Sequence, residues 1–334
     1  MKAKFLIGVL TGAMMFTLIG CGSSDSDETT EDTSSVAEET EDTSESASSE
    51  ETEESDEAEE SDEIEETADE EDASATEQSI TFDSLTVVDN DECSIVITGI
   101  DPDGMWGYTL DLELENKSED KTYMFAVQDT YANDVEVSGI FASEVAAGKK
   151  AIESMYFSTT TLEENGVGDI TDIEISIHVY DSDDWSSDDV ADETVHVYPY
   201  GEENAASFVR ESQESDQVLV DDDNVTVIVI GYDADSIWGY AVDVYLVNKT
   251  DASAMFTVDD ASVNGYMSDP FWATSVAGGK SSFASITWYD SSLEELGITD
   301  PENEIEEIEF VLKVYNYDDY TMDDYVNETV TLNP

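Results

Sequence analysis

The chain has 334 residues, of which 84 are acidic and 10 are basic, and its formal net charge is −74 at pH 7. Such a charge repels the phosphate backbone of nucleic acids and anionic lipid headgroups, so it excludes nucleic-acid binding and charge-driven membrane association. It is also expected to discourage self-association.

The first 20 residues have the organisation of a secretory signal peptide. Lys2 and Lys4 give a positively charged start, and residues 5–19 form an apolar run that is too short for a stable transmembrane helix. The segment LIGC that ends at Cys21 resembles the bacterial lipobox. This resemblance implies that Cys21 becomes an acylated N-terminus, which anchors the protein to the bacterial cell membrane in an extracytoplasmic location. The alternatives are an ordinary secreted protein with a chance cysteine, or an uncleaved membrane stub.

Residues 21–79 form a segment that consists almost wholly of Ser, Thr, Glu, Asp and Ala. After Cys21 it contains no Lys or Arg, and Val36 and Ile64 are its only larger apolar side chains. Such a segment cannot bury enough apolar surface to offset its ordering entropy, so a disordered acidic stalk is expected. A spacer through a cell wall is a sufficient role, and cation buffering or O-linked glycosylation is the alternative.

The rest of the chain repeats itself. Residues 105–117 (MWGYTLDLELENK) match residues 237–249 (IWGYAVDVYLVNK). The match continues in four further pairs of segments: 144–150 with 275–281, 162–167 with 293–298, 173–181 with 308–316, and 193–199 with 328–334. The sequence therefore predicts two homologous domains, residues 80–199 (repeat 1) and residues 217–334 (repeat 2), separated by a polar connector, residues 200–216.

Both repeats show the period-two alternation of half-buried β-strands. In repeat 1 one predicted strand face carries Trp106, Tyr108, Leu110, Leu112 and Leu114. Further apolar faces of this kind are Cys93, Ile95 and Ile97; Ile173, Ile175, Ile177 and Val179; and, in repeat 2, Ile308, Phe310, Leu312 and Val314. With Gly, Asn and Asp turns between them, these strands predict an all-β fold of two tandem antiparallel β-sandwiches. Only the LEENG and LEELG segments suggest short helical turns.

Several conspicuous residues have ordinary structural interpretations. Trp106 and Trp238 resemble ligand-stacking platforms, but they are in register with an apolar strand face, so both are predicted to lie in the core. Cys93 aligns with Val225 and is expected to be a small buried apolar residue. Neither of the two histidines occurs in both repeats, so neither is expected to be a catalytic base or a metal ligand of a shared site.

Two acidic loops occur in both repeats and are the candidate metal sites. The first loop has an Asp-x-Asp pair, and the second has two aspartate pairs that flank an aromatic residue. Calcium prefers six to eight oxygen ligands, which clustered carboxylates can supply, whereas solvated acidic surface is the alternative. The candidate calcium ligands are Asp101, Asp103, Asp183, Asp184, Asp188 and Asp189 in repeat 1, and Asp233, Asp235, Asp318, Asp319, Asp323 and Asp324 in repeat 2. The flanked aromatic residues, Trp185 and Tyr320, are candidate contacts for a cationic or sugar ligand.

Taken together, the Trp-Gly-Tyr, Asn-Lys, Ala-Gly-Lys or Gly-Gly-Lys and Leu-Glu-Glu motifs and the closing Val-Tyr strand of residues 80–334 resemble a known type of protein. It is the immunoglobulin-like tandem repeat of poorly characterised surface lipoproteins from Gram-positive, particularly clostridial, bacteria. The resemblance implies a fold and a location, and it carries no catalytic residues. The Cys…Trp…Cys pattern of antibody domains is missing from this sequence, which favours a generic sandwich.

An anchor, a stalk and a duplicated domain without a repeated catalytic constellation favour a non-enzymatic binding or scaffold protein at the cell envelope. Its partner is expected to be a protein or a glycan. The alternatives are a glycan-active hydrolase, since two carboxylates suffice for acid and base roles, or an accessory subunit of a cell-envelope complex.

Overall fold

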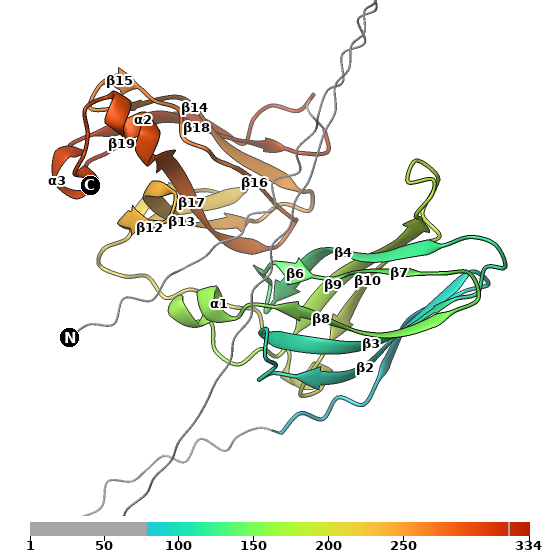
Figure 1. The fold of residues 1–334 in the computed structure, drawn as a ribbon. Helices are drawn as coiled ribbons and strands as arrows, with labels where there is room; N and C mark the ends of the chain where they lie inside the picture. Colours follow the sequence, from blue (N-terminus) through green and yellow to red (C-terminus); the bar gives the residue numbers. More distant parts are fainter. Residues whose placement is uncertain (1–78, 320) are drawn as a thin grey trace, which may run out of the picture. The chain divides into compact units, whose positions relative to one another are not determined.

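The computed structural model describes residues 79–319 and 321–334, in which nearly all of the regular secondary structure is β-strand (Figure 1). The all-β sandwich prediction is therefore confirmed. The predicted signal peptide, the lipidation site Cys21, the acidic stalk up to residue 78 and the candidate ligand contact Tyr320 lie outside the described residues. Among the described residues, no helix is long and apolar enough to cross a membrane.

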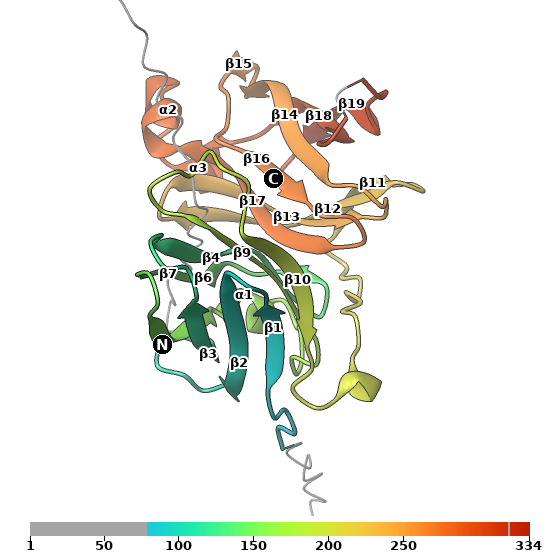
Figure 2. The same cartoon turned by 90° about the vertical axis from the view of Figure 1, so that its right-hand side faces the viewer.

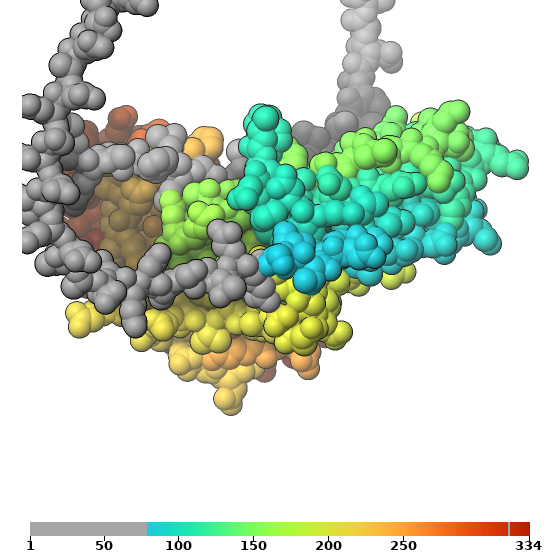
Figure 3. Space-filling view, turned by 90° about the horizontal axis from the view of Figure 1, so that it is seen from below, coloured from blue at the N-terminus to red at the C-terminus, as the bar shows by residue number. Residues whose placement is uncertain are grey.

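Repeat 1 is a sandwich of two sheets. The first sheet has the strand order β1-β2-β3-β8-β6, and the second contains β10, β9, β4 and β5, with β7 beside β4. These strands are β1 (Leu85–Asp89), β2 (Cys93–Asp101), β3 (Tyr108–Asn116), β4 (Tyr123–Ala132), β5 (Val135–Glu136), β6 (Gly139–Ile140), β7 (Ala142–Val145), β8 (Lys150–Phe157), β9 (Ile173–Asp181) and β10 (Ala191–Val197). In the space-filling view, the blue-to-teal first half of repeat 1 packs into one surface with the green second half (Figure 3).

Repeat 2 has the same two layers. Its first sheet contains β11, β12, β13 and β17, and its second has the order β15-β14-β18-β19, with β16 beside β14 (Figure 2). These strands are β11 (Gln217–Asp221), β12 (Val225–Ser236), β13 (Gly239–Asn248), β14 (Ala254–Val263), β15 (Tyr266–Met267), β16 (Ala273–Val276), β17 (Ser281–Tyr289), β18 (Ile308–Asn316) and β19 (Val326–Leu332).

The helical content of the described residues is confined to short turns. The LEENG and LEELG segments form α1 (Thr160–Glu164) and α2 (Asp290–Glu295), as predicted. A third turn, α3 (Pro301–Glu304), and a 3₁₀ turn in the connector, Glu202–Asn204, were not predicted. Both are four residues or shorter, a length at which side-chain periodicity gives no helical signal.

The predicted period-two faces form the cores of the two sandwiches. Leu110, Leu112 and Leu114 of β3 are fully buried, and so are the alternate residues of β9 and β18. Cys93 and its counterpart Val225 are also fully buried, as the alignment of the repeats predicts. Since burial of a large apolar side chain contributes about 1.5–3 kcal/mol, these repeated faces account for the choice of fold.

The prediction that Trp106 and Trp238 lie in the core is wrong. The two side chains are 72% and 57% exposed. The strand that carries the alternation, β3, begins at Tyr108, so Trp106 precedes it in a turn. The intervening Gly107 has φ +117°, a value outside the extended region, so the period of two does not continue through it.

The two repeats are joined by backbone pairing as well as by the connector. β5 of repeat 1 and β17 of repeat 2 pair in parallel, with Val135 opposite Ser281, so that their sheets form one nine-stranded sheet. In the connector, Phe208 donates its backbone N–H to the Asn133 carbonyl and packs against Phe283 of β17. The connector that the sequence defines by its polarity thus contacts both repeats in the structure.

Candidate ligand-binding site

One repeated motif, Asn-Lys, has a structural role in both copies. The buried Asn116 amide donates to the carbonyls of Lys121 and Val145, at 2.9 and 2.7 Å. Its counterpart Asn248 donates to two carbonyls at 2.8 Å each. The next residue, Lys117, donates to Asp89 at 2.6 Å, and the equivalent lysine of repeat 2 makes the same type of ion pair at 2.7 Å. These side chains satisfy loop carbonyls and fasten the first hairpin, so we assign them to the fold.

The Asp-x-Asp pairs lie at the tips of the β2–β3 and β12–β13 hairpins. The Asp103 N–H donates to Oδ1 of Asp101 at 3.1 Å, and the Asp235 N–H donates to Oδ1 of Asp233 at 2.9 Å. These are Asx turns, in which the first aspartate replaces a backbone acceptor and turns the chain. The first aspartate of each pair therefore shapes the tip that carries the tryptophan.

The Trp-Gly dipeptide follows at each tip, and its glycine is needed for steric reasons. A Cβ on Gly107 would lie 2.3 Å from the Phe157 carbonyl oxygen, and one on Gly239 would lie 2.2 Å from the Trp288 carbonyl oxygen. Both glycines also have positive φ, at +117° and +129°. This close approach lets the strands pair up to the very end of the hairpin and leaves the preceding tryptophan outside the core.

Other exposed apolar residues precede each tryptophan or lie on the strands that pair near it. In repeat 2, Trp238 follows the exposed Ile237, and Tyr289, which pairs with Gly239, stacks on Phe271 with ring centroids 5.9 Å apart. In repeat 1 the corresponding exposed residues are Met105, Trp106 and Ile140. We call these surfaces tip 1 (Met105, Trp106, Ile140) and tip 2 (Ile237, Trp238, Phe271, Tyr289). They are equivalent apolar surfaces at the same position in both repeats.

The second acidic loop, between β9 and β10, uses several of its carboxylates locally. Asp184 accepts a hydrogen bond from Ser186 at 2.7 Å, and Asp189 lies 3.4 Å from His178. Asp183 and Asp188 are exposed on the same loop. Trp185, the candidate ligand contact of this loop, is exposed and lies apart from the hairpin tips in the sequence.

The equivalent loop of repeat 2 is organised in the same way. The backbone N–H groups of Asp318 and Asp319 donate to the Asn316 side chain, at 2.8 and 2.9 Å, and Asp319 accepts from Thr321. Asp324 accepts from Asn327 at 3.0 Å, and Asp323 is exposed. Across residues 79–319 and 321–334, no group of three or more His, Cys, Asp or Glu side chains is placed to hold a metal ion. Calcium binding at either acidic loop stays a prediction.

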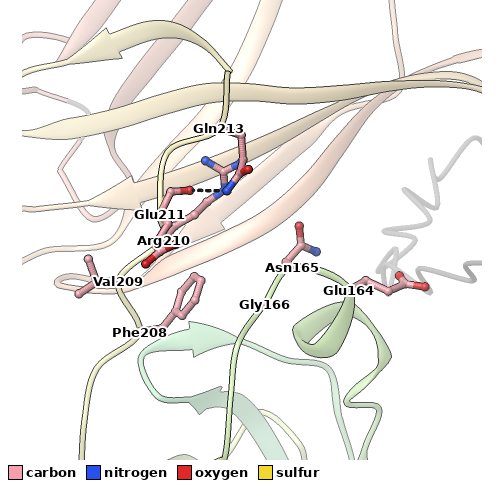
Figure 4. Close-up of a pocket in the computed structure, with 8 residues that line it drawn as sticks. All are labelled: Glu164, Asn165, Gly166, Phe208, Val209, Arg210, Glu211 and Gln213. Atoms are coloured by element: carbon pink, nitrogen blue, oxygen red, sulfur yellow. Dashed lines mark hydrogen bonds between the residues drawn. The ribbon is translucent and has the colours of Figure 1, made fainter. Parts of the chain in front are cut away.

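A shallow pocket of about 340 Å³ lies where the connector meets the turn after α1 (Figure 4). It is lined by Glu164, Asn165, Gly166, Phe208, Val209, Arg210, Glu211 and Gln213. Its one cationic group, Arg210, makes two hydrogen bonds to Asp216, at 2.7 and 2.8 Å, and lies 5.9 Å from the Tyr245 ring centroid. The Arg210 hydrogen bond holds the pKa of Asp216 below its ordinary value. Because this charge is already satisfied, we assign Arg210 to fastening the connector.

Cys93 and His196 of repeat 1 lie in surroundings that fit a role in the fold. Burial raises the pKa of the Cys93 thiol to about 11, so the thiol is protonated and unreactive at neutral pH. His196 lies between two carboxylates, 2.8 Å from Asp172 and 3.3 Å from Glu174.

Sequence reasoning missed the exposed tips because it extended a strand period across a glycine. The signal was in the sequence, since a glycine within a strand pattern often marks a bulge or a close backbone approach. It also missed Lys280 as an inter-repeat contact, because the aligned Lys149 occupies the same motif and is exposed. Only the partner residues, which lie far away in the sequence, distinguish the two lysines.

Comparisons with known proteins add little to this geometry. Neither a family model nor a curated protein sequence matches the chain. Among solved structures, the chain is similar to red sea bream transglutaminase, with 11% sequence identity and a TM-score of 0.19. The match covers 68% of this chain and 28% of the transglutaminase chain, so this chain corresponds to less than a third of that protein's length.

Proposed function

We propose that the protein is a non-enzymatic, lipid-anchored binding protein outside the cell, in which two β-sandwich repeats each present an exposed tryptophan tip to a ligand. The observation that supports this most directly is the exposure of Trp106 and Trp238 at equivalent positions. Tryptophan is on average among the highly buried residue types, and it is enriched in the residues that dominate binding energy. An exposed pair that contributes nothing to either core is suited to a surface contact.

The chemistry of the tips favours a glycan ligand. A tryptophan ring offers a large flat apolar face with a negative quadrupole, which suits the C–H faces of sugar rings and positively charged amino sugars. Asp103 and Asp235, three residues before the two tryptophans in the sequence, are carboxylates, a group that accepts hydrogen bonds from hydroxyl or ammonium groups. Two equivalent tips on one chain favour a polymeric glycan of the cell envelope, because two weak contacts on one polymer give high avidity.

The proposed ligand class can be tested with soluble cell-wall and plant polysaccharides. The full chain carrying Cys21→Ser would be compared with Trp106→Ala, Trp238→Ala and the double variant in affinity electrophoresis. We expect at least a tenfold loss of apparent affinity for each single variant, which corresponds to about 1.4 kcal/mol, and loss of measurable binding for the double variant.

Two further variants separate the tips from other surfaces. Val209→Ala changes an exposed apolar residue of the connector and is expected to leave binding unchanged. Trp185→Ala tests the acidic loop independently, and a loss of binding in this variant alone would move the ligand site there. Equal binding by all variants would contradict a role for the tips. Shortening of the polysaccharides during the same incubation would favour the hydrolase alternative.

The anchor has its own test. Cells that express the full chain would be labelled with a fatty-acid analogue and separated into membrane and medium fractions. We expect acyl label and membrane association in the wild type, and loss of both in Cys21→Ala. A labelled or membrane-bound Cys21→Ala variant would contradict acylation at this residue.

A further inference from the structure

The contact between the two repeats involves specific side chains. Nζ of Lys280 lies 2.6 Å from Oδ1 of Asp134 and 2.7 Å from Oε2 of Glu174, and it lies 5.1 Å from the ring centroid of Tyr131. Its side chain is 11% exposed. A corner of repeat 2 thus inserts a lysine into an acidic, aromatic surface of repeat 1.

Backbone contacts continue the same interface. The Ser281 N–H donates to the Asp134 carbonyl at 2.9 Å, next to the parallel pairing of Ser281 with Val135. Val135 and Ser281 are buried, and Phe283 packs against the hydrophobic core of repeat 1 as well as against Tyr245 of its own repeat and Phe208 of the connector. Two surfaces therefore meet here: residues 280–283 of repeat 2, which we call the inserting edge, and residues 131–136 with Glu174 of repeat 1, which we call the receiving hairpin.

Because the repeats are homologous, each of them carries both surfaces, and one copy of each surface is left over. The inserting edge of repeat 1 is residues 149–152, and the receiving hairpin of repeat 2 is residues 262–267 with Glu309. On the unused edge, Ile152 is 86% exposed where the used edge has the packed Phe283. On the unused hairpin, Tyr266 and Met267 are 64% and 66% exposed, whereas Val135, which aligns with Tyr266, is fully buried.

The strand edges are available as well. In the described sheets, β15 of the unused hairpin pairs with β14 alone, whereas the equivalent β5 pairs with both β4 and β17. β8 of the unused edge pairs with β3 along its length and with β6 only at Tyr156 and Phe157. The edge of β8 near Lys150 therefore has the unpaired backbone that β17 uses at Ser281.

The charges of the two unused surfaces are complementary. Lys149 and Lys150 are the only two basic residues adjacent in the whole sequence. Lys149 is exposed, whereas Nζ of Lys150 already lies 3.0 Å from Glu115 and 3.5 Å from Glu113, so Lys149 is the main positive charge of the unused edge. The unused hairpin carries the exposed Glu309 and, two residues earlier, the exposed Glu307. A local attraction of this kind opposes the general repulsion expected between two highly acidic chains, and it acts within a Debye length of about 8 Å at physiological salt.

We propose that a second copy of this chain docks head to tail, with residues 149–152 of one copy on the receiving hairpin of repeat 2 of the next. The contact is heterologous, so every added copy leaves the same two surfaces free and the assembly grows until it closes into a ring. The unused hairpin has Gly265 and Ser262 where the used one has Asp134 and Tyr131. It therefore lacks one carboxylate and one aromatic ring, and the contact between copies is weaker than the contact within the chain.

The intramolecular pairing supplies the design of a cross-linking test. Ser281 and Val135, which pair across the interface, align with Lys150 and Tyr266. Two single-cysteine proteins, Lys150→Cys and Tyr266→Cys, would be made in the full chain with Cys21→Ser and Cys93→Val, so that neither the anchor nor the native thiols contribute. Val209→Cys, at an exposed position of the connector, serves as the control.

Under mild oxidation, a mixture of Lys150→Cys and Tyr266→Cys is expected to form disulfide-linked dimers at least tenfold faster than either protein alone or either mixed with Val209→Cys. A protein with both cysteines is expected to form a ladder of oligomers. Adding Glu309→Lys to Tyr266→Cys should slow the reaction, and adding Lys149→Glu to Lys150→Cys should restore it. Equal rates for all pairs, or a slow rate that the charge exchange does not restore, would overturn the proposal.

Discussion

The Lys280 ammonium of repeat 2 lies 2.6 Å from the Asp134 carboxylate of repeat 1, 146 residues away in the sequence. The aligned lysine of repeat 1, Lys149, is exposed. One motif thus has two roles that depend on its surroundings: in repeat 2 it fastens the two sandwiches together, and in repeat 1 it lies on the surface. The difference between the two lysines gives a matched experiment.

Lys280→Met is expected to destabilise the protein, whereas Lys149→Met should be nearly neutral. Removing Lys280 leaves Asp134 and Glu174 partly buried without their cation, which costs about 1–3 kcal/mol. An exposed surface substitution changes the free energy of unfolding by less than about 0.5 kcal/mol. Urea unfolding followed by tryptophan fluorescence measures both values. Equal effects of the two substitutions would show that the inter-repeat ion pair contributes no stability.

The same ion pair predicts how stability depends on pH. Burial, the largest single influence, would raise the pKa of Asp134, but the hydrogen bonds from Lys280 and Ser207 and the nearby positive charge together hold this pKa below 3.8. Burial alone would lower the pKa of Lys280, but hydrogen bonds to Asp134 and Glu174 raise it above 10.5. The Asp134 contribution is present above its unfolded pKa and is lost as the pH falls through the lowered value. The Lys280 contribution is complete below its unfolded pKa and is lost as the pH rises through the raised value.

The stability difference between wild type and Lys280→Met should therefore be constant between about pH 5 and about pH 9 and shrink outside this window on both sides. Urea midpoints of the two proteins across a pH series measure it. A difference that persists unchanged into strong acid would contradict the pairing of Lys280 with Asp134.

The regular strands could be predicted from the sequence because a period of two describes a half-buried strand directly. Leu110, Leu112 and Leu114 follow that rule, and all three are buried. Trp106 breaks it because Gly107 ends the extended backbone just before β3. The exposed tips, and with them the candidate site, depend on a steric contact between that glycine and a carbonyl 50 residues away in the sequence. Periodicity along one strand carries no information about such a contact.

Gly239→Ala and Trp238→Ala alter adjacent residues, but only the first is expected to lower the free energy of unfolding strongly. The alanine Cβ at residue 239 would lie 2.2 Å from the Trp288 carbonyl oxygen at a positive φ, so a loss of about 2–4 kcal/mol is expected. Trp238→Ala removes an exposed side chain and should change the free energy of unfolding by less than about 0.5 kcal/mol. Thermal and urea unfolding of the two variants measure this contrast. A large loss of unfolding free energy in Trp238→Ala would show that this tryptophan has a structural role.

Asp243→Asn is expected to stabilise the protein at neutral pH. Burial, more than the neighbouring Asp233, raises the pKa of Asp243, although Ser285 donates a hydrogen bond to it at 2.7 Å. A carboxylate with a raised folded pKa lowers stability above that pKa, so the gain in the variant should shrink as the pH falls through the raised value. Urea midpoints at pH 7 and in mild acid measure the effect. Asp111→Asn is the matched control, since Asp111 is the aligned residue, is exposed, and accepts from Ser154 at 3.1 Å. No gain in stability is expected for Asp111→Asn.

Calcium binding at the acidic loops, which the sequence predicts, would raise the stability of the protein beyond the effect of ionic strength alone. Thermal unfolding would be measured with EDTA, with calcium, and with sodium at matched ionic strength. The comparison is a variant in which eight aspartates of the β9–β10 loop and the β18–β19 loop are changed to Asn. These residues are Asp183, Asp184, Asp188, Asp189, Asp318, Asp319, Asp323 and Asp324.

Charge screening shifts the unfolding temperature of the wild type equally in calcium and in sodium, whereas a bound ion stabilises only the protein that keeps its ligands. A site present at 100 times its dissociation constant would add about 2.7 kcal/mol to the wild type and nothing to the variant. A calcium-specific rise that the variant loses would establish the loops as metal sites. It would also imply that their carboxylates converge only when the ion is bound, since no three of them are so placed among the described residues.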